Sequence, residues 1–423
     1  MSQCLYLIFL FFQFSFVKLI IIYLPINIEA IDENNFNFTK SFLNRDVTTQ
    51  IKIGTPYQKI TPILSLTKSM FYISDIFDIK NNSKTYKEIE LVNKPNIGKK
   101  VYLSQDTFTF INEKNKEISF NDLPFLLNRE VKNNTLNNLL GISPGLSYDN
   151  SNENLLIILK TNNITNSRIF TIKFDKYNKS KGELIIGGYP SEYDKNYQEK
   201  NFQFMKVLVT YYDVAWSFNM NKIYYGNDCI MDKYELLVDF DINLNGIFAI
   251  KSLFDLIDQL YFNQYVNNSQ CFFYNVSNRY FYYVCDKNID VTQFKDIKFF
   301  CKDMNYTFVI NLKELYEEIN GLYYFMVFYD KFLPNKWTLG IPFLRKYQMV
   351  FNQDKKIIGV YTHIGNSINF GNILLNILII ILFLVIVILA FFYYKFFKKK
   401  NRKIRSNEID DNYDYISNEK LIN

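Results

Sequence analysis

The sequence predicts a large all-β domain of packed sheets with few short helices, followed by one membrane-spanning helix. Short apolar runs, many of them alternating with polar residues, recur along most of the chain and are separated by clusters of Asn, Gly, Pro and Asp. A long apolar run then comes close to the C-terminus. The 423 residues, 48% hydrophobic, suffice for one large two-lobed unit or two ordinary domains.

The predicted strands are runs of four to seven residues with the side-chain period of a β-strand. We expect them at 48–53, 107–111, 169–174, 183–186, 204–209, 280–284, 306–310 and 348–351. Helical patterns are fewer. The best are Leu155 to Thr161 and Ser252 to Tyr261, and Leu312 to Ile319 is a further candidate.

Charge and composition argue against several classes of function. The net charge is +6, part of it in a basic run after the last apolar stretch, and no nucleic-acid motif is visible, so we expect no nucleic-acid partner. The sequence has a single histidine, His363. Ser-His, Cys-His and multi-His metal chemistry are therefore not expected, and we predict neither a metal nor another cofactor.

The N-terminal thirty residues are strongly apolar and end in Ile28-Glu29-Ala30. This pattern predicts a secretory signal peptide, residues 1–30, cleaved near Ala30. An uncleaved signal anchor is the alternative, because the apolar run is long. A short segment, 31–47, would then precede the folded domain.

The second apolar run, Ile373 to Tyr394, is interrupted only by Asn376. At about 1.5 Å per residue, a helix of this length spans a hydrocarbon core about 30 Å thick. Seven Lys and Arg residues follow between Lys395 and Arg405, and such charge marks the cytoplasmic side. The sequence therefore predicts a single-pass type I membrane protein of the secretory pathway, cell surface or endolysosomal system, with residues 395–423 as a cytosolic tail.

Cysteines and glycosylation sequons suit a lumenal domain. Cys229, Cys271, Cys285 and Cys301 form an even set, which predicts two disulfides with three possible connectivities. The aromatic segment from Cys271 to Cys285 resembles a hairpin that one bridge could close. Candidate glycosylation sites are Asn37, Asn81, Asn133, Asn163, Asn178, Asn267, Asn275 and Asn305.

Five segments, in order, carry a family resemblance. They are Ile53-Gly54-Thr55-Pro56-Tyr57-Gln58, Tyr102 to Phe108, Leu139-Leu140-Gly141-Ile142, Gly182 to Gly188 with the later Trp216, and Trp337 to Gly359. The last reads WTLGIPFLRKYQMVFNQDKKIIG and is the most specific. Together they resemble the pepsin-like eukaryotic aspartic proteases over roughly residues 48–360.

The resemblance implies a bilobal, all-β fold, with one domain over residues 48–362, an N-lobe at about 48–185 and a C-lobe at about 186–362. In this family each lobe supplies one Asp-Thr/Ser-Gly loop to a cleft between the lobes, and a hairpin flap covers the cleft. The two carboxylates share one proton, since neighbouring like charges cannot both stay ionised. One then activates water while the other polarises the scissile carbonyl.

The first catalytic loop is altered. Counting on from the IGTP turn, the family's Asp-Thr-Gly-Ser-Ser falls on residues 65–69, which read Ser-Leu-Thr-Lys-Ser. Ser65 therefore replaces the first catalytic aspartate, and its hydroxyl does not ionise near neutral pH. The second loop falls on Asp239-Phe240-Asp241. Asp239 keeps the catalytic position, whereas Asp241 replaces Gly and is either a substitute carboxylate in the cleft or a solvated loop residue.

The flap is altered as well. Counting back from Tyr102, the flap tyrosine falls on Lys94, and Gly98 is the only glycine left nearby. These departures predict a catalytically deficient pseudoprotease that binds a peptide or protein ligand in the cleft. Residual aspartic endopeptidase activity through Asp239 is one alternative, and a structural surface glycoprotein is another.

Overall fold

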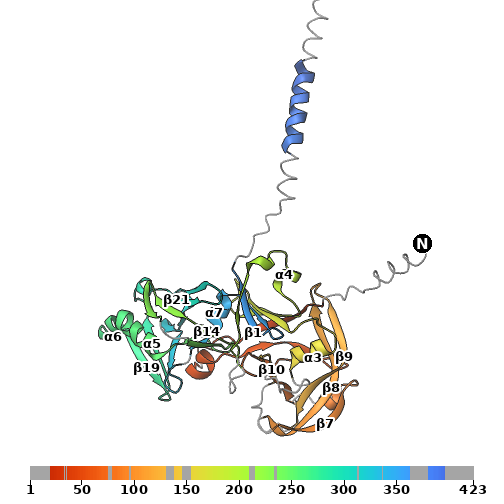
Figure 1. The fold of residues 1–423 in the computed structure, drawn as a ribbon, viewed down its shortest axis with the longest axis horizontal. Coiled ribbons are helices and arrows are strands. Elements are labelled where there is room, and N and C mark those ends of the chain that lie inside the picture. The colour runs from red at the N-terminus through yellow and green to blue at the C-terminus, as the bar shows by residue number, and fades with distance from the viewer. Residues whose placement is uncertain are drawn as a thin grey trace, which may run out of the picture. The chain divides into compact units, whose positions relative to one another are not determined.

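The computed structural model describes residues 20–32, 34, 36–74, 79–94, 97–129, 138–144, 154–208, 215–232, 236–311, 314–335, 337–362 and 380–395. The chain divides into two units, residues 1–364 and 365–423. The first unit contains every β-strand described below. It is built around three sheets, and strands from the two halves of the chain gather on opposite sides of it (Figure 1).

The largest sheet has fifteen strands, most of them from the N-terminal half of the unit. In order across the sheet, its strands are β13 (Phe202–Lys206), β28 (Ile357–Tyr361), β27 (Met349–Asn352), β11 (Ile169–Phe174), β12 (Lys181–Ile186), β1 (Ile22–Ile28), β2 (Val47–Thr49), β5 (Ile63–Ser65), β10 (Leu139–Gly141), β6 (Phe71–Ser74), β9 (Glu117–Asn128), β8 (Gly98–Asn112), β3 (Ile51–Ile53) and β4 (Gln58–Ile60), with β7 (Lys87–Lys94) beside β8.

The C-lobe contains the other two sheets. The nine-stranded sheet runs β14 (Ser217–Met220), β17 (Leu236–Phe240), β26 (Trp337–Leu339), β18 (Ile247–Phe248), β25 (Val327–Asp330), β20 (Tyr280–Asp286), β24 (Leu322–Phe325) and β23 (Tyr316–Ile319), with β19 (Cys271–Val276) beside β20. The four-stranded sheet runs β16 (Asp228–Met231), β15 (Lys222–Tyr225), β21 (Ile297–Cys301) and β22 (Tyr306–Ile310).

Helices in the first unit are short, as the sequence predicted. They are η1 (Phe38–Leu43), α2 (Ile79–Asn82), α3 (Leu155–Thr161), α4 (Pro190–Tyr193), η3 (Glu199–Asn201), α5 (Lys251–Ile257), η4 (Asp258–Phe262), α6 (Asn263–Asn267), η5 (Val291–Gln293) and α7 (Ile341–Lys346). The helices expected at 155–161 and 252–261 are present. The helix considered for 312–319 is wrong, because residues 316–319 form β23 and pair with β24.

Strand β1 extends the fold beyond the boundary that the sequence suggested. Residues 22–28 pair with β12 along most of their length and with β2 and β8 at the strand's two ends. Their apolar side chains alternate into the core, where Ile22, Leu24, Ile26 and Ile28 are buried. Successive side chains of a β-strand point to opposite faces, so every second residue of β1 lies on the buried face. Removal of residues 1–30 stays a prediction, and it would take β1 out of the sheet.

The division into lobes also differs from a single cut between residues 185 and 186. Strands β27 and β28, from the end of the domain, join the large sheet, where β27 pairs with β11 and β28 pairs with both β27 and β13. These strands are buried throughout, which suits their continuous apolar sequences. The large sheet therefore combines the N-lobe with a part that both halves of the chain build.

In the second unit, residues 380–395 are helical, with exposed apolar side chains. Among the described residues, no helix is both long enough and apolar enough to cross a membrane. The first part of the predicted span, residues 373–379, and the tail from 396 lie outside the described residues. The transmembrane helix therefore stays a prediction.

Candidate functional site

The two catalytic positions lie at the ends of corresponding strands. In the N-lobe, β5 runs parallel to β10, with Ser65 opposite Gly141. In the C-lobe, β17 runs parallel to β26, with Asp239 opposite Thr338. Each lobe thus presents its catalytic position at the end of a strand beside a parallel neighbour, and the register inferred from the sequence places Ser65 and Asp239 at these two ends.

Each of the two parallel neighbours ends in a glycine or is followed by one, and this glycine lets the catalytic loop approach closely. A Cβ on Gly141 would lie 2.5 Å from the carbonyl oxygen of Lys68, in the loop after Ser65. A Cβ on Gly340 would lie 2.1 Å from the carbonyl oxygen of Leu244, in the loop after Asp239. Both close approaches exclude any side chain. The framework of the two loops has therefore kept its glycines while the loop residues have changed.

Ser65 is 5% exposed, and its hydroxyl turns toward its own loop. Its Oγ accepts a hydrogen bond of 3.3 Å from the Thr67 amide and lies 3.3 Å from Thr67 Oγ1. The next side chain, Leu66, is fully buried in the main hydrophobic core. The loop that should carry the first carboxylate therefore carries a short hydroxyl and an apolar core residue.

Asp239 is 2% exposed, and a neighbouring strand supplies a hydrogen-bond donor to it. Ser217, its cross-strand partner on β14, donates from Oγ to Asp239 Oδ1 at 2.5 Å. The adjacent Phe240 is fully buried and packs against three aromatic rings, with ring centroids 5.5 to 5.8 Å apart, those of Phe218, Phe343 and Phe351. The hydroxyl that the family places next to this aspartate is thus replaced by a core ring.

Asp241 serves its own loop. It is half-buried, its Oδ1 accepts a hydrogen bond of 3.0 Å from the Asn243 amide, and its backbone amide donates to the Leu339 carbonyl at 3.1 Å. A carboxylate that accepts the amide two residues on is a common way to stabilise a turn. This geometry favours the loop role over that of a substitute catalytic carboxylate.

Asn243 joins the two loops, and the sequence analysis did not identify it. Its Nδ2 donates to the carbonyl oxygen of Leu64 at 2.9 Å, and its Oδ1 accepts from the Val47 amide at 3.0 Å. Its own carbonyl accepts from the Arg45 amide at 2.8 Å. One asparagine therefore ties the loop after Asp239 to the strand that ends in Ser65. Its place in the second loop is the only sequence signal that could have suggested this.

Trp216, which belongs to a family motif, makes a second connection between the lobes. It is fully buried, and its Nε1 donates to the Ile142 carbonyl at 2.8 Å. Its ring packs against Phe170 and Phe351 in the shared part of the large sheet. The tryptophan thus fixes the segment after β10 against the base of the C-lobe.

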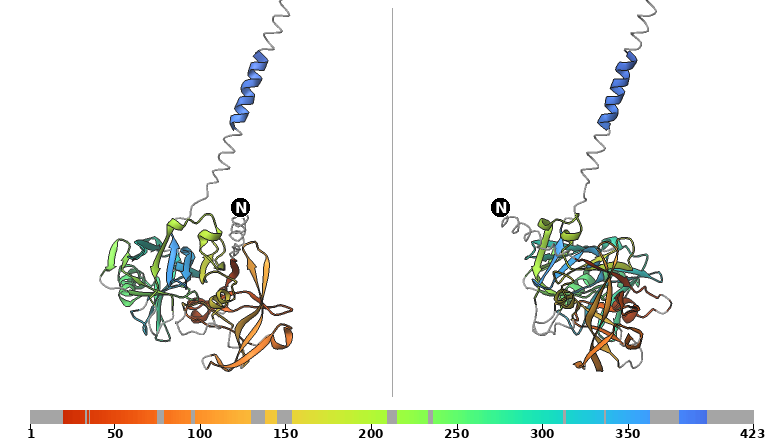
Figure 2. Two further views of the ribbon diagram at one scale, coloured as in Figure 1. Left: turned by 45° about the vertical axis from the view of Figure 1, so that its right-hand side comes forward. Right: turned by 90° about the vertical axis from the view of Figure 1, so that its right-hand side faces the viewer.

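The predicted flap is the hairpin of β7 and β8 (Figures 1 and 2). Lys94 and Gly98 face each other where the hairpin turns. Ile97 in that turn is buried in a small apolar cluster with Val101, Leu103 and Leu126, and partly buried Met70 and Tyr72 pack against the cluster. The Asn128 side chain also donates to the Ile97 carbonyl at 3.1 Å. The tip is thus held against β6 and the residue that precedes it.

Two of the four candidate cysteines are bonded. Cys271 and Cys285 face each other across β19 and β20 and form the bridge expected of this hairpin. The second predicted disulfide is wrong, because Cys229 and Cys301 are unbonded. Strand β15 lies between their strands. Two strand spacings of about 4.8 Å put their backbones beyond the reach of a disulfide.

The remaining predictions concern the glycosylation sites, the single histidine and metal binding. Of the sequon asparagines, Asn133 lies outside the described residues, and the other seven are exposed. Exposure permits a glycan but does not show one, so glycosylation stays a prediction. His363 also lies outside the described residues. Within the described ranges, no group of three His, Cys, Asp or Glu side chains could hold a metal ion.

The arrangement offers one carboxylate where the reaction needs two. Ser65 cannot share a proton with Asp239 as a second carboxyl would, because a serine hydroxyl does not titrate in this range. Loss of one member of such a pair removes several kcal/mol of transition-state stabilisation, which corresponds to several powers of ten in rate. The geometry therefore supplies one of the two carboxylates that a proton-sharing pair requires.

Comparison with known proteins agrees with this architecture. The solved structure of basic 7S globulin from soybean is 13% identical, with a TM-score of 0.62, over 83% of this chain and 97% of that one. That of conglutin gamma, a basic 7S globulin from lupine seeds, is 11% identical, with a TM-score of 0.59, over 82% and 96%. At these identities the likeness concerns the fold alone. The search of curated proteins found no match.

The family follows from a match over most of the chain. The model of the eukaryotic aspartyl proteases matches residues 47–362, the range that contains both altered catalytic loops, the flap hairpin and the closing strands. Strand β1 lies outside the matched range but inside the sheet. The chain belongs to the eukaryotic aspartyl protease family.

Proposed function

We propose that this family member is a catalytically deficient pseudoprotease that binds an extended peptide or protein segment in the cleft between its lobes. The observation that carries the proposal is the pair of catalytic positions, Ser65 and Asp239, which together supply a single carboxylate. Leu66 and Phe240 support it, because both are committed to the core where the family uses polar loop residues. Restoring the catalytic pattern would therefore require changes in the core as well as in the loops.

The flap hairpin supports the binding part of the proposal. Among the described strands, β7 pairs only with β8, so its other edge has backbone groups available for an added strand. Ile89 and Leu91 are 48% and 61% exposed on this edge strand. Register shifts at residues 88–90 and 92–94 bend the strand, which limits the length of a paired peptide to a few residues.

We also propose that the folded domain lies on the lumenal or outer side of a membrane. Its support is the apolar run at 373–394 and the basic residues after it. Glycosidase treatment of the full chain made in microsomes tests it. A mobility shift that becomes smaller when Asn178 and Asn275 are both changed to Gln supports a lumenal domain, and an unglycosylated chain contradicts it.

The decisive experiment measures cleavage and binding on the same full-length protein, purified in detergent. A degenerate peptide library is incubated with the parent and with Asp239→Ala between pH 3 and pH 7.5. We expect no cleavage by either protein. Cleavage by the parent that Asp239→Ala abolishes contradicts the pseudoprotease and favours the alternative, an endopeptidase that uses the surviving aspartate with its Ser217 hydrogen bond.

Binding is measured with the same library after fluorescent labelling. We expect Leu91→Asp to weaken retention of the bound peptides, because it places a charge on the exposed edge of β7. Leu333→Asp is the matched control, since this leucine is also exposed but lies in a turn of the C-lobe. If no peptide is retained, or if both variants bind like the parent, the structural glycoprotein becomes the better explanation.

A further inference from the structure

Strand β1 joins the two parts of the large sheet. In the order of strands across the sheet, β12 lies on one side of β1 and β2 lies on the other. Strand β12 belongs, with β11, β27, β28 and β13, to the part that both halves of the chain build, whereas β2 leads to the remaining strands of the N-lobe. Among the described strands, no other pairing connects these two parts. The sheet is therefore continuous only while residues 22–28 are present.

The pairing of β1 is extensive, and its apolar face is buried. Residues 22–27 face residues of β12, and residues 26–28 face residues of β2. Five apolar side chains in and just before the strand are at most 4% exposed: Ile21, Ile22, Leu24, Ile26 and Ile28. Without β1, the facing edges of β12 and β2 would lose their backbone partners, and the core would lose these side chains. Both losses are large compared with the small net stability of a folded domain.

Both ends of β1 are fitted to the rest of the fold. At its start, a Cβ on Gly187 would lie 2.6 Å from the carbonyl oxygen of Ile20, so this close approach of the backbone requires a glycine. Gly187 belongs to the segment 182–188 that carries part of the family resemblance. At the other end, the Ile28 amide donates to the Ser180 carbonyl at 2.8 Å. A family motif thus forms part of the place that β1 occupies.

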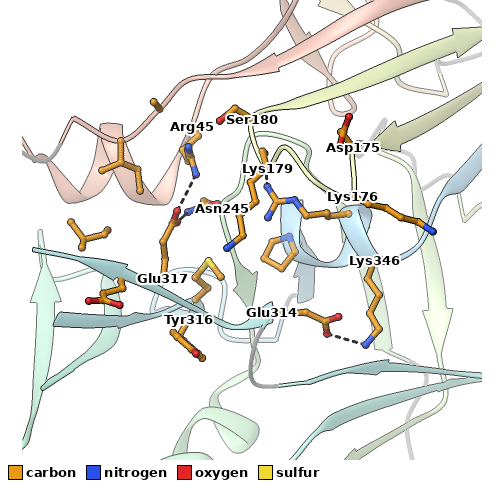
Figure 3. Close-up of a pocket in the computed structure, with 17 residues that line it drawn as sticks. Arg45, Asp175, Lys176, Lys179, Ser180, Asn245, Glu314, Tyr316, Glu317 and Lys346 are labelled. Carbon is orange, nitrogen blue, oxygen red and sulfur yellow. Dashed lines mark hydrogen bonds and ion pairs between the residues drawn. The ribbon is translucent and has the colours of Figure 1, made fainter. Parts of the chain in front are cut away.

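Arg45 holds the residue after β1 and connects it to the C-lobe. Arg45 is 8% exposed, and it donates from Nε and Nη2 to the Glu29 carbonyl at 3.0 and 2.6 Å. Its Nη1 lies 3.6 Å from Glu317 Oε1 on β23. Arg45, Ser180 and Glu317 line one pocket, in which a dashed line joins Arg45 to Glu317 (Figure 3). Loss of Glu29 would take a hydrogen-bond acceptor from a buried guanidinium, which is unfavourable.

Assigning β1 to the fold shortens the apolar N-terminal run that is left for targeting. Before Lys18, the chain is apolar from Leu5 to Val17 apart from Gln13 and Ser15. These thirteen residues fall within the range of about 7–15 for the apolar region of a signal peptide and below the roughly 17–25 that a membrane-spanning helix needs. Once β1 is counted as part of the domain, the length of the run no longer favours a signal anchor.

We propose that the mature protein keeps residues 20–30 as part of its folded domain and that its signal peptide ends before Ile20. Ala30 has the small side chain typical of a cleavage site, but cleavage there would remove the strand that joins the sheet. The proposal does not depend on what the cleft binds. It rests on entry into the secretory pathway, which the glycosidase experiment above measures separately.

The test determines the first residue of the mature protein. The full chain is made with its own N-terminus in insect cells, purified in detergent and freed of N-linked glycans, and its start is found by N-terminal sequencing and intact mass. We expect a first residue after Met1 and no later than Ile20. A protein that begins at Ile31 would overturn the retention of β1. A chain that still begins at Met1 would overturn the shorter signal peptide.

Variants of β1 give an independent readout. Leu24→Ala removes a buried side chain but leaves the segment apolar, and Asn27→Ala is the matched control at an exposed position of the same strand. We expect Leu24→Ala to lower the melting temperature of the purified protein by about 3–7 °C and Asn27→Ala to leave it unchanged. Cleavage near Ala30 would remove both positions and leave parent and variants with one mature sequence. Equal melting temperatures for the parent and Leu24→Ala would therefore overturn the proposal.

Discussion

The loop after β5 and the loop after β17 occupy corresponding places in the two lobes but have lost the catalytic pattern in different ways. The N-lobe loop has lost its carboxylate, since Ser65 carries a hydroxyl that bonds within the loop. The C-lobe loop has kept Asp239, hydrogen-bonded to Ser217, but has lost the small polar residues around it. In both loops the residue after the catalytic position, Leu66 or Phe240, is fully buried.

The comparison shows which features the fold depends on. Both lobes keep the parallel strand pair and the glycine that lets the neighbouring loop approach, Gly141 in one and Gly340 in the other. The N-lobe framework holds its strands without a catalytic carboxylate, whereas in the C-lobe Asp239 accepts a hydrogen bond from Ser217 on the paired strand β14. The active-site residues could therefore change while strand pairing and core packing preserved the fold.

The largest expected effect is the loss of unfolding free energy when one of the two buried loop residues, Leu66 or Phe240, is shortened to alanine. Phe240→Ala should lower the free energy of unfolding by about 3–5 kcal/mol, because it removes a ring that packs against three others. Leu66→Ala should cost less, about 2–4 kcal/mol, because its side chain is smaller. Denaturant unfolding of the full chain in detergent, followed by tryptophan fluorescence, measures both.

Phe332→Ala is the control for this comparison, because its ring is 67% exposed. It should change the free energy of unfolding by less than about 1 kcal/mol. If Phe240→Ala proved as stable as Phe332→Ala, the second loop would not depend on core packing, and the contrast between the two loops would be lost.

An intermediate effect is expected where the loops are joined. Asn243→Ala removes the side-chain hydrogen bonds to the Leu64 carbonyl and from the Val47 amide. Leaving two such backbone groups without partners should cost about 1–3 kcal/mol. Asn227→Ala, in an exposed turn, is the matched control and should have almost no effect. Equal unfolding curves for the two variants would mean that Asn243 does not couple the lobes.

The smallest expected effect is a change of stability with acidic pH, which depends on Asp354 beside the shared part of the large sheet. Burial alone would raise the pKa of Asp354, but hydrogen bonds from the Arg168 amide, Lys160 and the Arg168 side chain hold it below its usual value. A folded pKa below the unfolded value gives stability that is fully present above about pH 4 and is lost as the pH falls through the folded pKa.

Asp354→Asn should therefore be less stable than the parent by about 1–2 kcal/mol at neutral pH, and the difference should shrink below about pH 4. Unfolding curves at pH 3 and pH 7 measure it. Asp228→Asn, which breaks an exposed pair with Lys295, should change little at either pH. A difference that grows on acidification would reverse the sign and contradict the role assigned to Asp354.

Much of the architecture could be predicted because it is local. The apolar run at 169–174 is strand β11 at the same limits, and the pattern at 155–161 is helix α3. Motif order and spacing alone predict that Ser65 and Asp239 follow apolar strand residues. The helix considered for 312–319 is wrong, because an apolar run this short does not by its period distinguish a strand from a short helix, and residues 316–319 pair as β23.

The residues alone determined the family, the loss of the first catalytic carboxylate and the survival of Asp239, because motif order and spacing are properties of the chain. The tertiary structure decided that residues 22–28 form a core strand, that Cys229 and Cys301 stay unbonded and that Asn243 bridges the lobes. Each of these outcomes depends on how segments that are far apart in sequence are placed in space. Strand order and packing set such distances, and no local pattern encodes them.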